Sequence, residues 1–166
     1  MLFRSSLAGT HDAICGLGTT RRRIFVEQAG ALGFRFATVV HPAAYISPTT
    51  TLGRGVYVGP RAAISPSCRI GDHVIVLQGS LVGHHVEIGD FSSLMMGANV
   101  AGSVRIGEAT WIATGAVVID HVDIGSDAVV AAGAVVVADV PDHVQDRKST
   151  RLNSSHSQQS RMPSSA

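Results

Sequence analysis

The sequence predicts a mostly β fold, a solenoid of short strands and turns that follows a partial α/β unit. An aliphatic residue stands at every sixth position from Ile46 to Val136, sixteen times and without insertion or deletion. A second register, from Thr50 to Val140, holds only small or β-branched residues. A period of six fits neither a helix nor a plain strand alternation, whereas a solenoid stacks such positions into one continuous core.

Residues 1–40 lack the six-residue period and predict a single α/β unit. The expected elements are a strand at 13–15, a turn at 16–18, a helix capped by Thr19 or Thr20, and a strand at 36–40. One such unit cannot bury both faces of a parallel sheet by itself. We therefore interpret this segment as the trailing remnant of a larger, Rossmann-like α/β domain whose beginning is absent from the sequence.

Residues 41–146 are the predicted solenoid. Three hexads make one triangular coil, so residues 18 positions apart are expected to stack. Glycines that directly follow an inward aliphatic residue are expected at sharp corners that need permissive backbone angles. These glycines are Gly53, Gly59, Gly71, Gly83, Gly89, Gly107 and Gly125. Residues 147–166 break the pattern and are rich in serine, so we expect a disordered tail that is not native to the protein.

Composition excludes several classes of partner. The chain has 166 residues and a net charge of +1, which provides no electrostatic reason to expect nucleic acid or an anionic membrane. No apolar run approaches the length of a membrane span. The two cysteines form no disulfide framework, and Cys68 stands in the inward small-residue register. We expect a cytoplasmic protein.

The histidines in the run 82–91 are the candidate catalytic residues. His84 and His85 follow the corner glycine Gly83 and are expected to point outward from the coil. An imidazole titrates near neutrality and can accept a proton from an amine or a hydroxyl. By spacing alone, however, solvated turn histidines are the simpler interpretation. Stacked carboxylates at 72, 90 and 108 are likewise expected to be exposed corner residues rather than a cation site.

Residues 13–141 resemble the hexapeptide-repeat sugar O-/N-acetyltransferases, specifically the family of sialic acid O-acetyltransferase (NeuD) and bacillosamine acetyltransferase. The motifs that carry the resemblance are ATVVHPAAYISP, GSLVGHHVEIGDFSSLMMGANVAGSVRIGE and IATGAVVIDHVDIGSDAVVAAGAVVVADVP. The resemblance implies a left-handed parallel β-helix, a homotrimer with its active sites between solenoids, acetyl-CoA as acyl donor and a sugar acceptor. The acceptor would be a nucleotide-linked amino sugar or a sialic acid, in cell-surface polysaccharide biosynthesis. Residues 1–40 would be what remains of the nucleotide-sugar domain.

The resemblance also implies residue roles. His84 matches the general base of the family. The resemblance also implies that the acetyl group passes directly from the thioester to the acceptor. The next position is usually acidic in the family but is His85 here, so the acidic partner would be Glu87 or a carboxylate of a neighbouring subunit. Ser93 matches a position near the thioester carbonyl. Thr114 and Ala132 match positions that line the pantetheine arm of the cofactor, and no metal is implied.

Two other functions remain open from the sequence. A γ-carbonic-anhydrase-like metalloprotein would share the solenoid and bind zinc through three histidines. His84 and His121 are spaced suggestively, but Ala116 and Ser126 stand where a closely following histidine pair would be needed. A non-catalytic hexapeptide-repeat scaffold is the second alternative. Zinc analysis tests the first of these, and acetyl-CoA binding tests the second.

Overall fold

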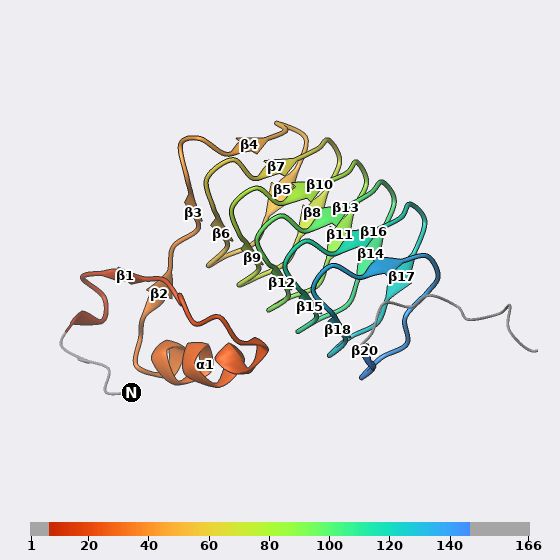
Figure 1. Cartoon of the computed structure of the whole chain (residues 1–166). Coiled ribbons are helices and arrows are strands. Elements are labelled where there is room, and N and C mark those ends of the chain that lie inside the picture. Colours follow the sequence, from red (N-terminus) through yellow and green to blue (C-terminus); the bar gives the residue numbers. More distant parts are fainter. Residues whose placement is uncertain (1–6, 147–166) are drawn as a thin grey trace, which may run out of the picture.

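The computed structural model describes residues 7–146 as a left-handed parallel β-helix with a small α/β segment beside its N-terminal end (Figure 1). Three sheets of two-residue strands form the faces of the triangular coil. The seven-stranded sheet comprises β3 (Val39–Val40), β6 (Tyr57–Val58), β9 (Ile75–Val76), β12 (Ser93–Leu94), β15 (Trp111–Ile112), β18 (Val129–Val130) and β20 (Gln145–Asp146). The six-stranded sheet comprises β4 (Tyr45–Ile46), β7 (Ala63–Ile64), β10 (Leu81–Val82), β13 (Asn99–Val100), β16 (Val117–Val118) and β19 (Val135–Val136). The five-stranded sheet comprises β5 (Thr51–Leu52), β8 (Arg69–Ile70), β11 (Glu87–Ile88), β14 (Arg105–Ile106) and β17 (Asp123–Ile124).

The predicted stacking of residues 18 positions apart is confirmed. Val82 pairs with Val100, for example, and Val100 pairs with Val118, in parallel register along the six-stranded sheet. Both inward registers are buried from Val56 onward and form one core. Each coil therefore covers the apolar side chains of the next coil, as expected for a solenoid.

Polar members of the small-residue register satisfy their hydrogen bonds inside the core. Each side chain donates to the backbone carbonyl 15 residues later. The pairs are Thr50 to Ser65, Cys68 to Gly83, Ser80 to Met95, Ser92 to Gly107 and Thr110 to Gly125, at 2.7–3.0 Å. Buried hydroxyls are tolerated only when they are paired in this way. Cys68 is accordingly a packing residue, as predicted.

The expectation for the corner glycines is wrong. The positive φ angles recur every sixth residue at other positions, such as Gly79, His85 and Gly97. Gly83 and the other glycines after the aliphatic residues are required by close approach between coils instead. A Cβ at Gly83 would lie 2.6 Å from the backbone carbon of Ala101 in the next coil. The neighbouring coil, rather than the turn angle, therefore selects glycine there.

The N-terminal segment forms the expected strand–helix–strand unit. β1 (Asp12–Ala13) pairs in parallel with β2 (Arg35–Phe36). Between them lie a 3₁₀ turn, η2 (Thr20–Arg22), and α1 (Arg23–Ala31). The Thr19 hydroxyl accepts the backbone N–H of Arg21 and caps the turn, as predicted. The strand expected at 36–40 is divided, because β2 ends at Phe36 and β3 already belongs to the solenoid.

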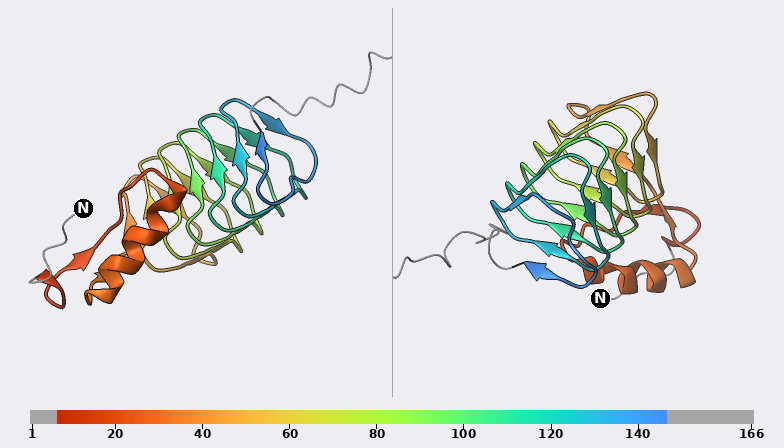
Figure 2. Two further views of the ribbon diagram at one scale, coloured as in Figure 1. Left: turned by 90° about the horizontal axis from the view of Figure 1, so that it is seen from below. Right: turned by 90° about the vertical axis from the view of Figure 1, so that its right-hand side faces the viewer.

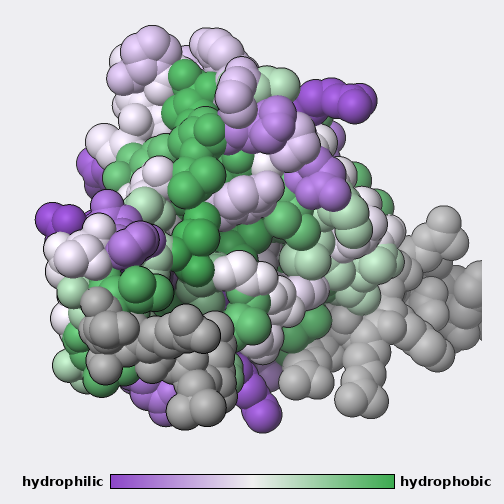
Figure 3. Space-filling model, turned by 90° about the vertical axis from the view of Figure 1, so that its left-hand side faces the viewer, coloured by the Kyte–Doolittle hydropathy of each residue, from purple (hydrophilic) through white to green (hydrophobic). Residues whose placement is uncertain are grey.

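The segment lies along one side of the first coils (Figure 2). Apolar surface gathers at this end of the molecule (Figure 3), where Val39 and Val40 of β3 are exposed. A membrane-crossing helix is absent from residues 7–146, in which α1 has nine residues. The predicted tail at 147–166 lies outside the described residues.

Candidate active site

Sequence-predicted site residues lie on two corners and one face of the coil. We call the corner between the six-stranded and five-stranded sheets the histidine corner; it carries His84, His85, Gly102, Ser103, Asp120 and His121 in successive coils. The corner between the seven-stranded and six-stranded sheets carries Met96, Thr114 and Ala132, and we call it the small-residue corner. Ser93 lies on the seven-stranded sheet, in β12.

At the histidine corner, His84 and His85 are exposed and in contact with each other. Their Nδ1 atoms are 3.0 Å apart, and the ring planes stand at 83°. His85 has a φ of 57°, so its backbone turns the corner while its side chain returns toward His84. The corner therefore presents two hydrogen-bonded imidazoles, each with ring nitrogens that can donate or accept a hydrogen bond.

Gly102, one coil further on, lies directly beneath the His84 ring. A Cβ at Gly102 would lie 2.7 Å from Cε1 and 2.8 Å from Nε2 of His84. Asp120 occupies the equivalent place in the following coil, so the corner itself accepts a side chain there. A side chain at position 102 would therefore require the ring of His84 to move.

We expect Gly102→Ala to displace the His84 imidazole, because the added Cβ would lie 2.7 Å from the ring. The measurement is the position of the His84 ring resonances in ¹H–¹⁵N spectra, together with the thermal unfolding midpoint. Asp120→Ala, at the equivalent place without an imidazole above it, is the matched control. Unchanged His84 resonances in Gly102→Ala would contradict this contact.

No carboxylate takes the place of the missing acidic partner of His84 within residues 7–146. Glu87 pairs instead with Arg69 across the five-stranded sheet, at 3.4 Å. The carboxylate of Asp120 lies 3.8 Å from the His121 imidazole. Among the described residues, the His84 side chain forms its hydrogen bond with His85.

Ser93 is buried under a residue that sequence reasoning missed. Arg22 is fully buried, and its guanidinium donates to the Ser93 hydroxyl at 2.9 Å. Its other N–H groups donate to the carbonyls of Thr19, Ser92 and His73, the last accepting two of them. All five guanidinium donors are thus used without a carboxylate partner. Burial lowers the pKa of Arg22 to about 10, with Cys15 opposing the shift.

A small cavity adjoins Ser93. It has a volume of about 300 Å³ and lies between the loop after β1 and the seven-stranded sheet, lined mainly by Cys15, Tyr57, Leu77, Ser93 and Met95. Arg22 therefore joins the N-terminal segment to the solenoid through Ser93, one of the residues that line this cavity. Its position in the run Arg21-Arg22-Arg23 resembles an exposed basic cluster, so the sequence carries no signal that singles it out.

The column at the small-residue corner is stacked as predicted. The N–H of Gly115 donates to the Met96 carbonyl, and the N–H of Gly133 donates to the Thr114 carbonyl, each at 3.0 Å. Thr114 and Ala132 are exposed beside these glycines. An extended chain can lie along such a column because no large side chain protrudes except Met96. The cofactor roles of Ser93, Thr114 and Ala132 remain predictions.

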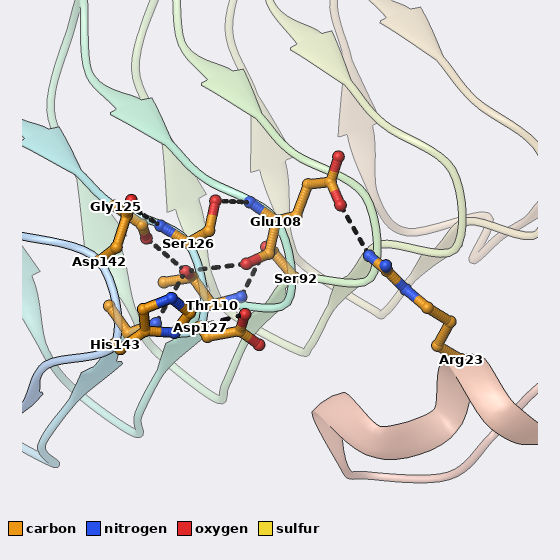
Figure 4. Close-up of polar contacts among 10 residues, drawn as sticks. Arg23, Ser92, Glu108, Thr110, Gly125, Ser126, Asp127, Asp142 and His143 are labelled. Carbon is orange, nitrogen blue, oxygen red and sulfur yellow. Dashed lines mark hydrogen bonds and ion pairs between the residues drawn. The ribbon is translucent and has the colours of Figure 1, made fainter.

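The third corner, between the five-stranded and seven-stranded sheets, carries the stacked acidic residues and supports the fold. The carboxylates of Asp72 and Asp90 accept backbone N–H groups of the preceding coil. Burial opposes ionisation of Asp72, but hydrogen bonds and the charge of Arg54 outweigh it and lower its pKa. Further along this corner, Ser126 caps Glu108, which pairs with Arg23 of α1 (Figure 4). Among the described residues, no group of three potential metal ligands lies together.

The predicted site residues do not gather within one chain. The histidine corner and the small-residue corner lie at opposite edges of the six-stranded sheet, and Ser93 lies on the seven-stranded sheet. One chain therefore holds the parts of a site on different faces.

Comparison with known proteins gives one family and several structures. The bacterial transferase hexapeptide family (six repeats) matches residues 49–84 and 103–138. No curated protein gives a significant match. PerB from Caulobacter crescentus, solved with CoA and GDP-perosamine, is 38% identical over 78% of this chain and 63% of its own, with a TM-score of 0.76.

Two further structures are similar. The acetyltransferase domain of PglB from Neisseria gonorrhoeae, solved with acetyl coenzyme A, is 36% identical over 80% of this chain and 65% of its own, with a TM-score of 0.77. WeeI from Acinetobacter baumannii, at 19% identity and a TM-score of 0.54 over 78% of this chain and 64% of its own, shares the fold. The chain spans less than two thirds of the length of these three structures.

Proposed function

The repeat region of this chain matches the bacterial transferase hexapeptide family, and from that premise we propose that the protein is an acetyl-CoA-dependent sugar acetyltransferase. The observation that carries the proposal is the 36–38% identity, over about four fifths of the chain, to two proteins solved with CoA or acetyl-CoA. The GDP-perosamine in the PerB structure favours an amine on a nucleotide-linked sugar as the acceptor. A sugar hydroxyl, as in a sialic acid, is the second candidate acceptor.

In the proposed mechanism, His84 is the general base. Its Nε2 removes a proton from the acceptor amine as the amine nitrogen attacks the thioester carbonyl. The tetrahedral oxyanion is stabilised by hydrogen-bond donors, for which backbone N–H groups and the Ser93 hydroxyl are candidates. The C–S bond then breaks, and CoA leaves as a thiolate while His84 holds the proton. The His84 imidazolium then gives this proton to the thiolate. Atoms balance without a covalent acyl-enzyme.

We further propose that the protein works as a homotrimer. Its outward apolar residues are concentrated on the six-stranded sheet: Tyr45, Leu81, Val117 and Val135 are 59%, 46%, 37% and 44% exposed. Asn99 of β13 is the exposed polar residue between Leu81 and Val117 in this column. A largely apolar face of this kind is typical of a protein interface. The face joins the histidine corner to the small-residue corner, so a second copy packed there would complete the divided site. The two free cysteines fit the proposed location, the cytoplasm, and the proposed role is in cell-surface polysaccharide biosynthesis.

Acetyl-CoA binding is the direct test of the proposed function. At a concentration 100 times its Kd, the ligand is expected to stabilise the protein by about 2.7 kcal/mol, seen as a rise in the thermal unfolding midpoint. Ala132→Glu should abolish the rise, because its side chain would obstruct the small-residue corner. Ala138→Glu, an exposed alanine outside that column, is the control. Absence of any rise would favour the scaffold alternative, and stoichiometric zinc would favour the metalloprotein.

The assembly gives a separate prediction. We expect light scattering to report a trimer for the unaltered protein and a monomer for Leu81→Glu, since burying an unpaired carboxylate in an apolar interface is costly. Thr51→Glu, an outward position on the five-stranded sheet, should remain a trimer. A monomeric unaltered protein with full activity would refute the trimer.

A further inference from the structure

The contact between His84 and His85 constrains the protons on both rings. It joins the Nδ1 of one ring to the Nδ1 of the other at 3.0 Å. A hydrogen bond between two such nitrogens needs one of them to carry a hydrogen and the other to have a free lone pair. When both rings are neutral, one ring is therefore the Nδ1–H tautomer and the other is the Nε2–H tautomer.

The two possible arrangements differ in what they leave on His84. If His85 is the donor, the hydrogen of His84 lies on Nε2, and that nitrogen cannot accept a proton. If His84 is the donor, its Nε2 keeps a free lone pair. Only the second arrangement suits a general base that acts through Nε2.

The surrounding backbone holds the pair in place. The N–H of His85 donates to the carbonyl of Pro66 in the preceding coil, at 3.0 Å. The carbonyl of His84 accepts the N–H of Ser103 in the following coil, at 2.8 Å. Gly102 supports the His84 ring from below. The left-handed φ of His85 turns its side chain back along the chain. Neighbouring coils thus fix the backbone positions from which the two rings meet.

Charged groups around the corner are engaged elsewhere. On the adjacent sheet, Glu87 pairs with Arg69. Two coils further on, Asp120 lies beside His121. Among residues 7–146, the contact that can orient the His84 imidazole is therefore the one with the ring of His85.

We propose that His85 is a positioning residue that accepts the Nδ1–H of His84 and holds His84 in the tautomer with a free Nε2. The inference rests on the proposed function of His84 as the base. The His85 imidazole would thus replace the carboxylate that orients the catalytic histidine of a Ser-His-Asp triad. Once Nε2 has taken the proton of the acceptor, the Nδ1–H of the His84 imidazolium still donates to His85, now in a charge-assisted hydrogen bond.

The test is the tautomer of His84, read by two-bond ¹H–¹⁵N correlation spectra of ¹⁵N-histidine protein at a pH where both rings are neutral. We expect the Nδ1–H form in the unaltered protein and the Nε2–H form in His85→Ala. His85→Asn should restore the Nδ1–H form, because the amide oxygen is an acceptor and asparagine tolerates a left-handed backbone. Because the Nε2–H form of His84 cannot accept a proton at Nε2, kcat should fall about 10- to 100-fold in His85→Ala. It should recover in His85→Asn, with KM little changed in both variants.

His121→Ala is the matched control, because His121 turns the same corner two coils later with a φ of 59°. Like His85→Ala, this substitution places alanine at a position with left-handed φ. It should change neither the His84 tautomer nor kcat. An Nε2–H tautomer of His84 in the unaltered protein would overturn the inference whatever the activity. If the tautomer responds as expected but His84→Ala keeps full activity, the pair stands as a structural feature and the proposed function of His84 fails.

Discussion

Replacing His84 with alanine is expected to lower kcat for acetyl transfer by about 10²–10⁴-fold, the typical contribution of a positioned general base. Without the imidazole, the amine must lose its proton to solvent while it attacks the thioester. Because His84 is exposed, stability should change by less than about 0.5 kcal/mol. The variant therefore separates catalysis from folding.

The measurement is steady-state kinetics with acetyl-CoA and a panel of nucleotide-linked amino sugars, together with thermal unfolding. Asp120→Ala is the control, because Asp120 is exposed at the same place of the corner two coils further on. It should retain the unaltered kcat. Acetyl transfer by His84→Ala at the unaltered rate would show that His84 is not the base.

Replacing Arg22 with alanine is expected to release the N-terminal segment from the solenoid. The substitution removes all five donors of the guanidinium and leaves the carbonyls of His73 and Ser92 without them. A buried acceptor left unsatisfied costs about 1–3 kcal/mol. We therefore expect a loss on the order of 3 kcal/mol or more in the stability of the docked segment, because several such acceptors and a cavity are created together.

The solenoid should remain folded in this variant, because its core is closed by stacking between coils and does not include the segment. Native-state hydrogen exchange is the measurement: protection should fall across 12–36 and persist in the solenoid strands. Arg21→Ala, an exposed neighbour, is the control. Arg22→Lys should not restore protection across 12–36, since an ammonium has three donors and cannot form the planar set of five. Unchanged exchange in Arg22→Ala would contradict the role of Arg22 in docking the segment.

His73 shows why the segment and the first coils depend on each other. Its buried ring stacks on Phe91 with centroids 5.1 Å apart and meets the edge of Phe36 from β2 at 4.9 Å. Its carbonyl accepts two hydrogen bonds from Arg22. Burial lowers the pKa of the His73 imidazole, so the ring is neutral where it packs. These contacts join residues far apart in the sequence and follow from no local pattern.

The candidate site was only partly predictable. The positions of His84, Thr114 and Ala132 in the coil follow from counting, because each is a fixed number of residues from the buried aliphatic register. Counting does not predict the ring contact between His84 and His85. It also does not predict that Gly102 lies beneath the His84 ring. Both features depend on the left-handed angle at His85 and on the distance between coils, which a one-dimensional period does not contain.

The six-residue period is sufficient to predict the solenoid, its register and the outward direction of the histidines. The physical reason is that every sixth side chain must be buried, and stacking coils of three hexads is the arrangement that buries them all. Packing in three dimensions sets which glycines turn the corners, where Arg22 docks the N-terminal segment, and how the two imidazoles face each other. Those outcomes depend on close approach between coils and on desolvation of single groups. Both are set by neighbours in space that the chain order does not reveal.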